Sequence, residues 1–590
     1  MWKKVQFIKS YVIISVRFLM LLNMRRNIVI IEIKSTLLEI INKVFGELNI
    51  KSAPILERPK DRTMGDVAIP CFSYAQEKRQ SPNLIAQAIK EKLTGELLAE
   101  VEAIGGYVNL FLNKEKVTND VLRSIFTEQE NYGSQKMGEG KTVVLDYSSP
   151  NIAKPFGVGH LRSTVIGNAI RKILDKLGYT TVGINHLGDY GTQFGKIIWA
   201  YKKWGNEEAI KANPIEELSK LYVMFHDQAE YDPTLEDEAR AWFKKLEDKD
   251  EEATKLWEWV RAESLKEFMK TYELLGITDF DSYHGEAFYI DKMQPVIDEL
   301  EAKNLLVEDA GAQIVKLEEG TPVLITRSDG GSLYITRDLA AIFYRHRTYN
   351  FDEILYVIGN EQTLHVKQLK AVVAKMGYDW HKNVHHIGFG MILQGGKKMS
   401  TRRGKVVQLH DVLEQAIELA ENYITDKNNQ LEDKHKISQQ IGVGAVIFND
   451  LKNYRTNDID FNLEDILKFE GETGPYIQYT YARINSIINQ YKDIDFIVKK
   501  DYINEYIWNI IMQLVNFDEI IVNARNHYDP SLIAKYMIDL AQDYNKFYAQ
   551  ERVITEDIKE TNFKLFLSQA TAIVLKEGMR LLGISMPKKM

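Results

Sequence analysis

Two short stretches of the sequence combine glycine, histidine and basic residues. The first, SSPNIAKPFGVGHLRST at 148–164, follows the apolar run VVLDY at 143–147 and leads into a segment with helical spacing at 161–178. Glycines let a backbone approach a phosphate closely, and the N-terminus of the following helix offers free N–H groups. His160 can then donate to phosphate oxygens on which negative charge develops. A histidine in such a turn is also often purely structural, so this stretch alone leaves both interpretations open.

The second stretch is GGKKMSTRRGK at 395–405, with five basic residues among the nine from Lys397 to Lys405. Cationic side chains on a glycine-bounded loop suit a triphosphate whose charge rearranges during a reaction. Taken alone, a solvated basic loop or an RNA-binding patch is the simpler interpretation. The function therefore depends on whether the fold brings the two stretches together.

The elements that would position these stretches follow a repeating pattern from residue 141 onward. Apolar runs typical of buried strands alternate with helical segments, and a long acidic helical insert occupies roughly 205–275. Alternation of this kind predicts a doubly wound parallel sheet, in which ligands bind at the carboxyl ends of the strands. The expected strands are 143–147, 180–191, 354–359 and 385–393.

The two ends of the chain have different secondary-structure patterns. Residues 31–135 indicate a small α/β unit, with helices at 37–48 and 85–93 and a strand pair in 101–114 around Gly105-Gly106. From about 410 the pattern becomes helical. The expected helices there are 411–424, 437–455, 475–491, 503–527, 531–551 and 561–582, with a polar loop at 493–501.

Composition bounds the class of protein. The chain has 590 residues, 45% of them hydrophobic and 27% charged, with a formal net charge of −8. These values are ordinary for a globular protein of about three or four domains. A protein that coats nucleic acid would be basic, so any contact with nucleic acid must use local patches. Cys71 is the single cysteine, which excludes an intramolecular disulfide framework and fits a reducing cytoplasm.

The first 23 residues need separate treatment. Their apolar run, 11–22, is too short to span a membrane and contains Arg17. Lysines precede the run as in a signal peptide, but no small-residue cleavage site follows it. We expect 1–23 to be a non-native or disordered extension, and we expect the folded protein to begin near Met24.

Together, the two stretches resemble the HIGH and KMSKS signatures of class I aminoacyl-tRNA synthetases. GVGH, ending at His160, stands where HIGH is expected, and KMSTR, from Lys398 to Arg402, stands where KMSKS is expected. Gly157 replaces the first histidine of HIGH, and Thr401-Arg402 replaces the final Lys-Ser. Gly157 therefore puts in doubt only the contact of a first histidine with ATP.

Six stretches in register narrow the resemblance to the arginyl-tRNA synthetases over about 31–590. They are SPNIAKPF (149–156), LGDYGTQFG (187–195), YITRDLAA (334–341), GKKMSTRRGKVV (396–407), GPYIQYTYAR (474–483) and LLGISMPKKM (581–590). Departure from the KMSKS ending is usual in that family. There, a lysine upstream of the HIGH motif is thought to supply the missing charge, and Lys154 holds that position here.

The resemblance implies which residues handle ATP. The expected catalytic residues, which would serve the phosphates, are Lys154, His160, Lys398 and Arg402. The adenine is expected near Gly159, against the strand that ends at Gly390-Met391. The full set of expected ATP contacts is Gly157, Gly159, His160, Gly390, Met391, Lys398, Met399 and Ser400. Mg²⁺ is expected to accompany ATP, with no metal held by the protein.

The resemblance also implies how arginine is selected. A guanidinium group is a planar fork of five donors that is always charged, and carboxylates bind it best. Asp338 is the expected guanidinium partner, and Tyr334, four residues earlier, would share a helix face with it. The expected pocket consists of Asp146, Asn151, Tyr334, Asp338 and Gln362. Such a polar pocket can reject lysine or citrulline by ~10⁴ or more, so no editing domain is expected.

The implied organisation is an α/β, doubly wound parallel-sheet (Rossmann-like) catalytic domain at 136–465, with a small α/β tRNA-binding domain at 24–135 and an all-α anticodon-binding domain of the DALR type at 466–590. Aromatic residues suit the reading of unpaired anticodon bases. Tyr479 and Met590 are the expected tRNA contacts, with Tyr544, Phe547 and Tyr548 as weaker candidates.

The implied reaction is ATP-dependent ligation of L-arginine to tRNA(Arg) through arginyl-adenylate, by a cytoplasmic monomer that needs bound tRNA for the activation step. Two alternatives remain at this point: another nucleotidyltransferase of the same superfamily, and a non-catalytic tRNA-binding paralogue. The helical C-terminal third and the YITRD motif count against the first. The presence of Lys154 and His160 counts against the second.

Overall fold

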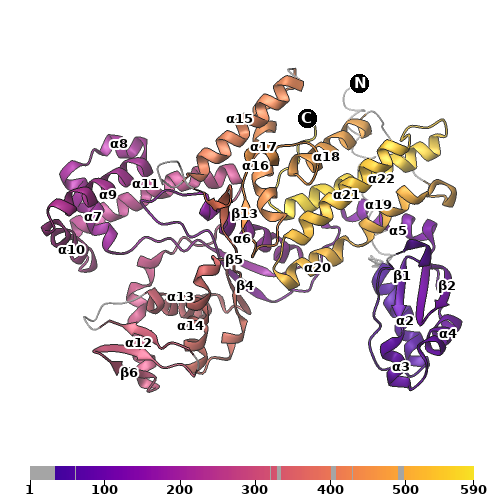
Figure 1. Cartoon of the computed structure of the whole chain (residues 1–590), viewed down its shortest axis with the longest axis horizontal. Helices are drawn as coiled ribbons and strands as arrows, with labels where there is room; N and C mark the ends of the chain where they lie inside the picture. Colours follow the sequence, from indigo (N-terminus) through magenta and orange to yellow (C-terminus); the bar gives the residue numbers. More distant parts are fainter. Residues whose placement is uncertain are drawn as a thin grey trace, which may run out of the picture. The chain divides into compact units, whose positions relative to one another are not determined.

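The computed structural model describes residues 33–59, 61–318, 320–327, 334–399, 407–427, 430–489 and 497–590 (Figure 1). The expected extension at 1–23 lies outside these residues, as do Ser400, Arg402 and the side chain of Lys398. The described chain divides into two compact units. One contains the residues up to Gln129 with 497–515 and 553–570, and the other contains 130–489, 516–552 and 571–590.

The first unit is a small sheet covered by helices, as the sequence predicts. Its antiparallel strands run in the order β1-β3-β2, and the β2–β3 hairpin turns at Gly105 and Gly106, whose φ angles of 58° and 86° favour glycine. Ser81 caps α4 by accepting a hydrogen bond from the Leu84 N–H, and a proline follows it at the first helical position. The elements are α2 (Ile33–Glu47), η1 (Arg62–Met64), β1 (Val67–Pro70), α3 (Phe72–Lys78), α4 (Pro82–Lys92), β2 (Leu98–Ile104), β3 (Tyr107–Leu112), α5 (Lys114–Glu128), η6 (Lys500–Tyr502) and α19 (Glu505–Val515).

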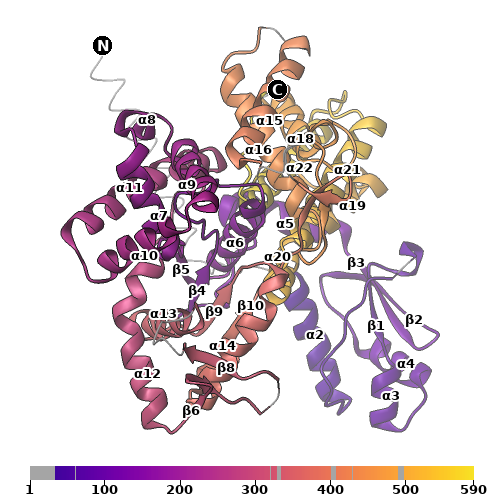
Figure 2. The same cartoon turned by 60° about the vertical axis from the view of Figure 1, so that its left-hand side comes forward.

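The second unit is built on a four-stranded parallel sheet in the order β10-β9-β4-β5. Val143, Val144 and Leu145 of the central strand β4 are 0% exposed, as expected of a strand covered on both faces. Helix α6 lies on one side of the sheet, and α13 and α14 lie on the other (Figure 2). The elements are β4 (Thr142–Asp146), α6 (Gly159–Lys176), β5 (Thr180–Ile184), α13 (Tyr334–Tyr349), β9 (Glu353–Tyr356), η4 (Asn360–Gln362), α14 (Thr363–Lys375), η5 (Asp379–Asn383) and β10 (Val384–His386).

The topology of this sheet selects one edge for ligands. The chain leaves β4 for β5 on one side and later returns to β9 on the other, so the carboxyl end of β4 is a switch point where crevices form in doubly wound sheets. Asp146 ends β4, and the GVGH turn follows it. The predicted position of the first motif at this edge is therefore confirmed.

Two insertions interrupt the parallel sheet. The first is a group of helices, of which the last four make up the expected acidic insert: α7 (Thr192–Trp204), α8 (Glu207–Ala212), α9 (Pro214–Tyr231), α10 (Thr234–Glu247) and α11 (Glu251–Leu275). A second insertion, which the sequence did not indicate, forms an antiparallel sheet in the order β6-β7-β8. Its elements are η3 (Glu286–Lys292), α12 (Met293–Ala302), β6 (Leu306–Asp309), β7 (Ala312–Val315) and β8 (Val323–Thr326).

The expected strand at 385–393 is wrong as a single element. It separates into β10 in the parallel sheet and β11 (Ile392–Gln394), which pairs with β12 (Lys397–Lys398) and β13 (Ile459–Asp460). Gly388 and Gly390 lie between the two pieces. A Cβ at Gly390 would stand 2.6 Å from the backbone of Asn457, so the chain turns there at a point of close backbone approach.

The helical last third is confirmed with one correction. The expected helix 503–527 is two helices, because the backbone breaks at Asn516 between α19 and α20. The remaining helices are α15 (Leu409–Lys427), α16 (Lys434–Leu451), α17 (Leu463–Ile466), α18 (Gly474–Ile488), α20 (Phe517–His527), α21 (Ser531–Gln550) and α22 (Ile558–Leu581). No helix in the described part of the chain combines the length and apolar character needed to cross a membrane.

Candidate functional site

The segment between β4 and α6 has a strained backbone that hydroxyl groups hold in place. Ser148, Ser149 and Ala153 have φ angles of 74°, 50° and 56°, in a region that side chains rarely adopt. The Ser148 N–H donates to Ser163 Oγ at 2.8 Å, and Ser148 Oγ lies 2.8 Å from Thr164 Oγ1. These bonds fasten the end of β4 to the first turns of α6.

His160 is the second residue of α6, which begins at Gly159. Its half-buried ring packs 5.5 Å from the ring of Phe156. Burial lowers the pKa of His160, although a hydrogen bond with the backbone of Ser148 opposes the shift. The imidazole is therefore neutral at physiological pH and can donate a hydrogen bond without adding a charge.

The chain that follows the second stretch pairs directly with the first motif. The Val158 N–H donates to the Val407 carbonyl at 3.0 Å, and the Leu409 N–H donates to the Phe156 carbonyl at 2.9 Å. Gly157 and Gln408 are the bridged residues between these two hydrogen bonds. Two stretches almost 250 residues apart in the sequence thus meet at one turn.

The strand end at Gly390-Met391 is fixed by the connection between α16 and β13. The Gly390 N–H donates to the Arg455 carbonyl at 3.0 Å, and the Met391 N–H donates to Asp458 Oδ1 at 2.7 Å. Arg162 of α6 donates to the Asn457 carbonyl at 2.7 Å, from the same connection. The connection therefore holds α6 and the Gly390-Met391 segment together.

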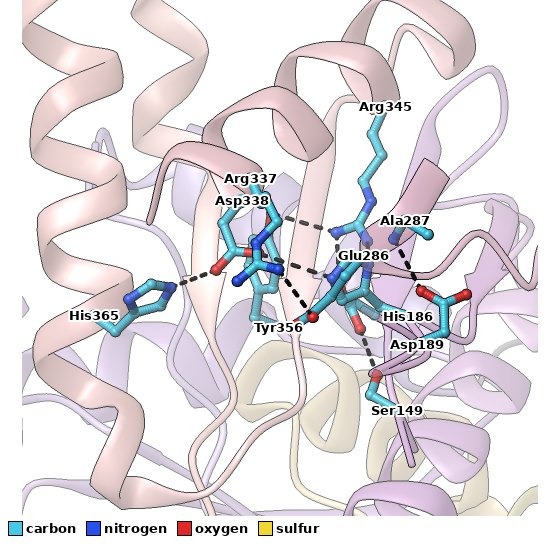
Figure 3. Close-up of polar contacts among 11 residues, drawn as sticks. Ser149, His186, Asp189, Glu286, Ala287, Arg337, Asp338, Arg345, Tyr356 and His365 are labelled. Atoms are coloured by element: carbon cyan, nitrogen blue, oxygen red, sulfur yellow. Dashed lines mark hydrogen bonds and ion pairs between the residues drawn. The ribbon is translucent and has the colours of Figure 1, made fainter. Parts of the chain in front are cut away.

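Beside the turn lies a cluster of carboxylates with internal partners (Figure 3). Asp146 accepts a hydrogen bond from Ser149 Oγ at 3.0 Å through Oδ1, and its Oδ2 pairs with Arg345 Nη1 at 2.8 Å. The Arg345 side chain is 1% exposed. Asp146 is therefore anchored on both oxygens at the base of the cluster.

Asp338, on α13, stands between two imidazoles. His365 Nε2 lies 2.5 Å from Asp338 Oδ2, and His186 Nε2 lies 3.9 Å from Oδ1. Burial raises the pKa of Asp338, but the hydrogen bond with His365 and the electrostatic effects of His186, His365 and Arg345 outweigh it and bring the pKa below its usual range. Asp338 is thus an ionised carboxylate, and its side chain is 28% exposed.

A second carboxylate faces the same space from the element η3. Glu286 pairs with Arg337 Nη1 at 3.2 Å. Burial raises the pKa of Glu286 to about 7; Arg337 opposes the shift, and the charges of Asp338 and Asp189 add to it. Tyr334 stacks against the Arg337 guanidinium at 4.6 Å and is 66% exposed. A bound cation would relieve the repulsion between Glu286 and Asp338.

The remaining predicted arginine contacts, Asn151 and Gln362, are exposed. Asn151 is exposed and bridges to Gly188, where a Cβ would stand 2.2 Å from Asn151 Oδ1. This close approach explains why LGDYG has a glycine at Gly188. Gln362 and Lys154 are also exposed. Exposed polar side chains such as these suit the polar backbone end of an amino-acid ligand.

The C-terminal helices carry a separate aromatic platform. Arg483 of α18 lies 4.8 Å from the ring centroid of Tyr479 and 5.0 Å from that of Tyr548. Tyr479 is 41% exposed and Tyr548 is 39% exposed. Tyr544 and Phe547 are 0% exposed, so these two weaker candidates are wrong, because they belong to the core of α21.

Family models match most of the chain. The model described as "tRNA synthetases class I (R), catalytic domain" matches 121–463. The "DALR anticodon binding domain" matches 477–590, and the "Arginyl tRNA synthetase N terminal domain" matches 32–112. An arginine–tRNA ligase of Exiguobacterium sp. is 52% identical over 558 residues, which cover 94% of this chain and 99% of the relative. The chain belongs to the arginyl-tRNA synthetase family.

Further relatives agree with this assignment. An arginine–tRNA ligase of Enterococcus faecalis is 52% identical, and the match covers 91% of this chain and 95% of that protein. The structure of an arginyl-tRNA synthetase from Plasmodium falciparum superposes with a TM-score of 0.79 at 25% identity, covering 95% of this chain and 99% of the other. The Thermus thermophilus arginyl-tRNA synthetase gives a TM-score of 0.78 at 24% identity, over 94% and 100%, and so supports the fold.

Within this family fold, the structure reveals pocket residues that the sequence did not indicate. His186 follows β5, Glu286 begins η3, and His365 begins α14. Each has an ordinary local context, and only tertiary packing places all three beside Asp338. His365 had the clearest available signal, because it lies three residues after the predicted Gln362 on the same helix start.

Proposed function

We propose that this protein ligates L-arginine to tRNA(Arg) in an ATP-dependent reaction through arginyl-adenylate. The observation that carries the proposal is the direct pairing of 156–158 with 407–409 beside an acidic pocket. Membership of the arginyl-tRNA synthetase family supports it. ATP and arginine would then meet at the carboxyl end of β4.

Arginine binds with its guanidinium group in the acidic pocket. Asp338 accepts the guanidinium hydrogen bonds, Glu286 faces it as a second carboxylate, and Tyr334 covers it. A protonated Glu286 would ionise as the cation enters, because a nearby positive charge favours the carboxylate. Asn151 and Gln362 bind the α-amino and carboxylate ends at the rim, and Asp146 supplies negative charge below the α-amino group.

ATP binds across the turn. The adenine packs near Gly159 and Gly390-Met391, and the N–H groups at the start of α6 face the phosphates. His160 donates to the α- and β-phosphates as the arginine carboxylate attacks the α-phosphate, which releases pyrophosphate. Lys154, Lys398 and Arg402 neutralise the β- and γ-phosphates, and the remaining proposed contacts are Gly157, Met399 and Ser400.

Mg²⁺ enters this scheme as the counter-ion of ATP. Across the described ranges, no group of three or more histidine, cysteine or acidic side chains is arranged to hold a metal ion. In the proposed scheme Mg²⁺ would be bound mainly by phosphate oxygens and water, as is usual in nucleotide sites. When bound, it would neutralise phosphate charge.

The acyl group then passes from the adenylate to the 3′-terminal ribose of the tRNA. We propose that Tyr479 and Met590 contact the anticodon and that Arg483, which stacks with Tyr479, belongs to the same surface. Arginine activation should require bound tRNA. We further propose a cytoplasmic monomer with a tRNA-binding domain at 24–135, a catalytic domain at 136–465 and an anticodon-binding domain at 466–590.

One assay tests the function. Purified protein should attach radiolabelled arginine to total tRNA in the presence of ATP and Mg²⁺, and His160→Ala should abolish the attachment. Failure of the wild-type protein would favour a non-catalytic tRNA-binding role, and ATP-dependent transfer to a different acceptor would favour another nucleotidyltransferase. Arginine-dependent pyrophosphate exchange, measured with and without tRNA, tests the tRNA requirement, and equal rates would refute it.

A further inference from the structure

Asp338 has a titratable group against each of its two oxygens (Figure 3). His365 Nε2 lies 2.5 Å from Oδ2, and His186 Nε2 lies 3.9 Å from Oδ1. The His365 side chain is 27% exposed and that of His186 is 14% exposed. His365 can therefore exchange a proton with water at the edge of the pocket, whereas His186 lies deeper.

The contacts of His186 fix its protonation state. Its Nδ1 lies 3.2 Å from Arg345 Nη2, and a guanidinium group can only donate, so Nδ1 must accept. The proton of His186 is then on Nε2, which faces Asp338. Burial lowers the pKa of His186 and Arg345 lowers it further, against the opposing charges of Asp146, Asp338 and Asp189. His186 is thus a neutral donor.

His365 is in the opposite situation. Its hydrogen bond with Asp338 raises its pKa, and the charge of Asp338 adds to this effect, while burial opposes it. The protonated form of His365 is therefore favoured beside Asp338, which then has an internal cation as a partner. Arg345 and Glu286 are the other charged groups that face Asp338, the first lowering its pKa and the second sharing mutual repulsion with it.

We propose that His365 is a positioning residue for arginine recognition, which holds the Asp338 carboxylate through Nε2–H and loses its second ring proton to solvent when a guanidinium group binds. The proposal rests on the proposed function, in which Asp338 receives the guanidinium of arginine. The guanidinium group and protonated His365 are two cations that compete for Asp338. Because a guanidinium group never gives up its charge, the imidazole is the group that loses a proton. Neutral His365 keeps its hydrogen bond to Oδ2 and leaves Oδ1 for the substrate.

The proton balance gives a direct measurement. Arginine binding to the full-length protein is followed by titration calorimetry at pH 6.0, 7.0 and 8.0, in pairs of buffers with different ionisation enthalpies. We expect proton release at pH 6.0, with up to one proton per arginine from His365 in addition to the proton from Glu286, and this release should decline toward pH 8.0. Because the hydrogen bond with Asp338 raises the pKa of His365, arginine affinity should fall as the pH is lowered from 8.0 to 6.0.

A substitution tests whether His365 is the source of the proton. His365→Gln retains an amide donor near the position of Nε2 but cannot titrate, so proton release per arginine should fall to the part that comes from Glu286, and the pH dependence of arginine affinity should weaken. In aminoacylation assays at pH 6.0, the wild-type protein should show a raised KM for arginine with kcat at saturating arginine retained, and the variant should show a smaller rise. His381→Gln, at a histidine of η5, is the matched control and should keep the wild-type pH profile.

Three outcomes would overturn the inference. The first is tight arginine binding by the wild-type protein without proton release, a measurement that needs no variant and leaves the proposed function intact. The second is equal proton release by the wild type and His365→Gln. The third is a variant that binds arginine more weakly by the same factor at every pH, which would indicate a structural role. Absence of arginine binding at all three pH values would refute the proposed function, and the inference with it.

Discussion

Replacement of Gly159 by alanine separates contact with ATP from damage to the fold. Gly159 is the first residue of α6, is exposed, and has no heavy atom within 4 Å of the place where a Cβ would lie. Alanine is favoured over glycine in a helix by about 1 kcal/mol, and less at a helix end. The thermal midpoint of Gly159→Ala should therefore equal or slightly exceed that of the wild type.

The effect on ATP should be larger and of the opposite sign. If the adenosine packs against Gly159, the added methyl group occupies a position that ATP needs. Overpacking by one methyl group typically costs about 1–3 kcal/mol, which corresponds to roughly a 5- to 150-fold loss of ATP affinity. The KM for ATP in aminoacylation, at saturating arginine and tRNA, should rise within that range while the KM for arginine stays unchanged.

A matched control exists in the first unit. Gly46 of α2 is also a helical glycine with open space at the Cβ position, so Gly46→Ala should likewise keep or slightly raise the thermal midpoint and should leave the KM for ATP unchanged. A KM for ATP within twofold of the wild type in Gly159→Ala, with an unchanged thermal midpoint, would refute the placement of ATP on this turn. A selective rise in the KM for arginine would assign the turn to the other substrate.

Three further predictions concern other parts of the site. Arg162→Met should destabilise the second unit by about 3–5 kcal/mol in thermal unfolding and raise the KM for ATP, because it leaves the buried Asp450 carboxylate, 3.1 Å away, without its partner. The double variant Arg162→Met/Asp450→Leu should recover most of the stability but not the KM for ATP. Recovery of both would show that Arg162 does not hold α6 in place for ATP binding. Arg483→Met should raise the KM for tRNA by roughly 10- to 100-fold with the KM for ATP unchanged, since a stacked base contributes about 1–3 kcal/mol. An unchanged KM for tRNA would mean that the surface formed by Tyr479, Arg483 and Tyr548 does not bind tRNA. Gly157→His should raise tRNA-dependent pyrophosphate exchange by up to about tenfold, because a hydrogen bond to a charged group contributes about 1.5 kcal/mol, and an unchanged rate would mean that Gly157 carries no catalytic penalty.

The elements that could be predicted from sequence are those with a strong local signal. β4 is an apolar run of β-branched residues followed by a proline and glycine turn, and the β2–β3 hairpin has two glycines between alternating residues. The sheet β6-β7-β8 was missed because its strands are four residues long and partly exposed, so their pattern resembles loop sequence. The break at Asn516 contains neither glycine nor proline, and helical spacing continues across it.

The pocket could be predicted only where a motif identified it. Asp338 and Tyr334 come from one recognisable helix start, and both indeed lie on α13. Glu286 and His365 come from different elements, and their shared position beside Asp338 is a consequence of packing around the parallel sheet. The exposure of individual aromatic residues could not be predicted from the sequence either. Tyr544 and Tyr548 lie on the same helix, yet Tyr544 is 0% exposed and Tyr548 is 39% exposed.

The strained segment after β4 explains how one short stretch serves two substrates. Left-handed backbone at a residue other than glycine costs of order 1–3 kcal/mol, and a glycine at Ser148 would remove that cost. The serine is nevertheless useful, because its backbone and hydroxyl make three hydrogen bonds, to Ser163, Thr164 and Tyr272, each with a net contribution of about 0.5–1.5 kcal/mol. Ser149, at the next strained position, donates to Asp146 in the carboxylate cluster. The hydrogen bonds of Ser148 to the start of α6 and of Ser149 to Asp146 thus offset the backbone strain. Because Ser148 and Ser149 are consecutive, the backbone between them fixes the distance between the proposed ATP and arginine sites.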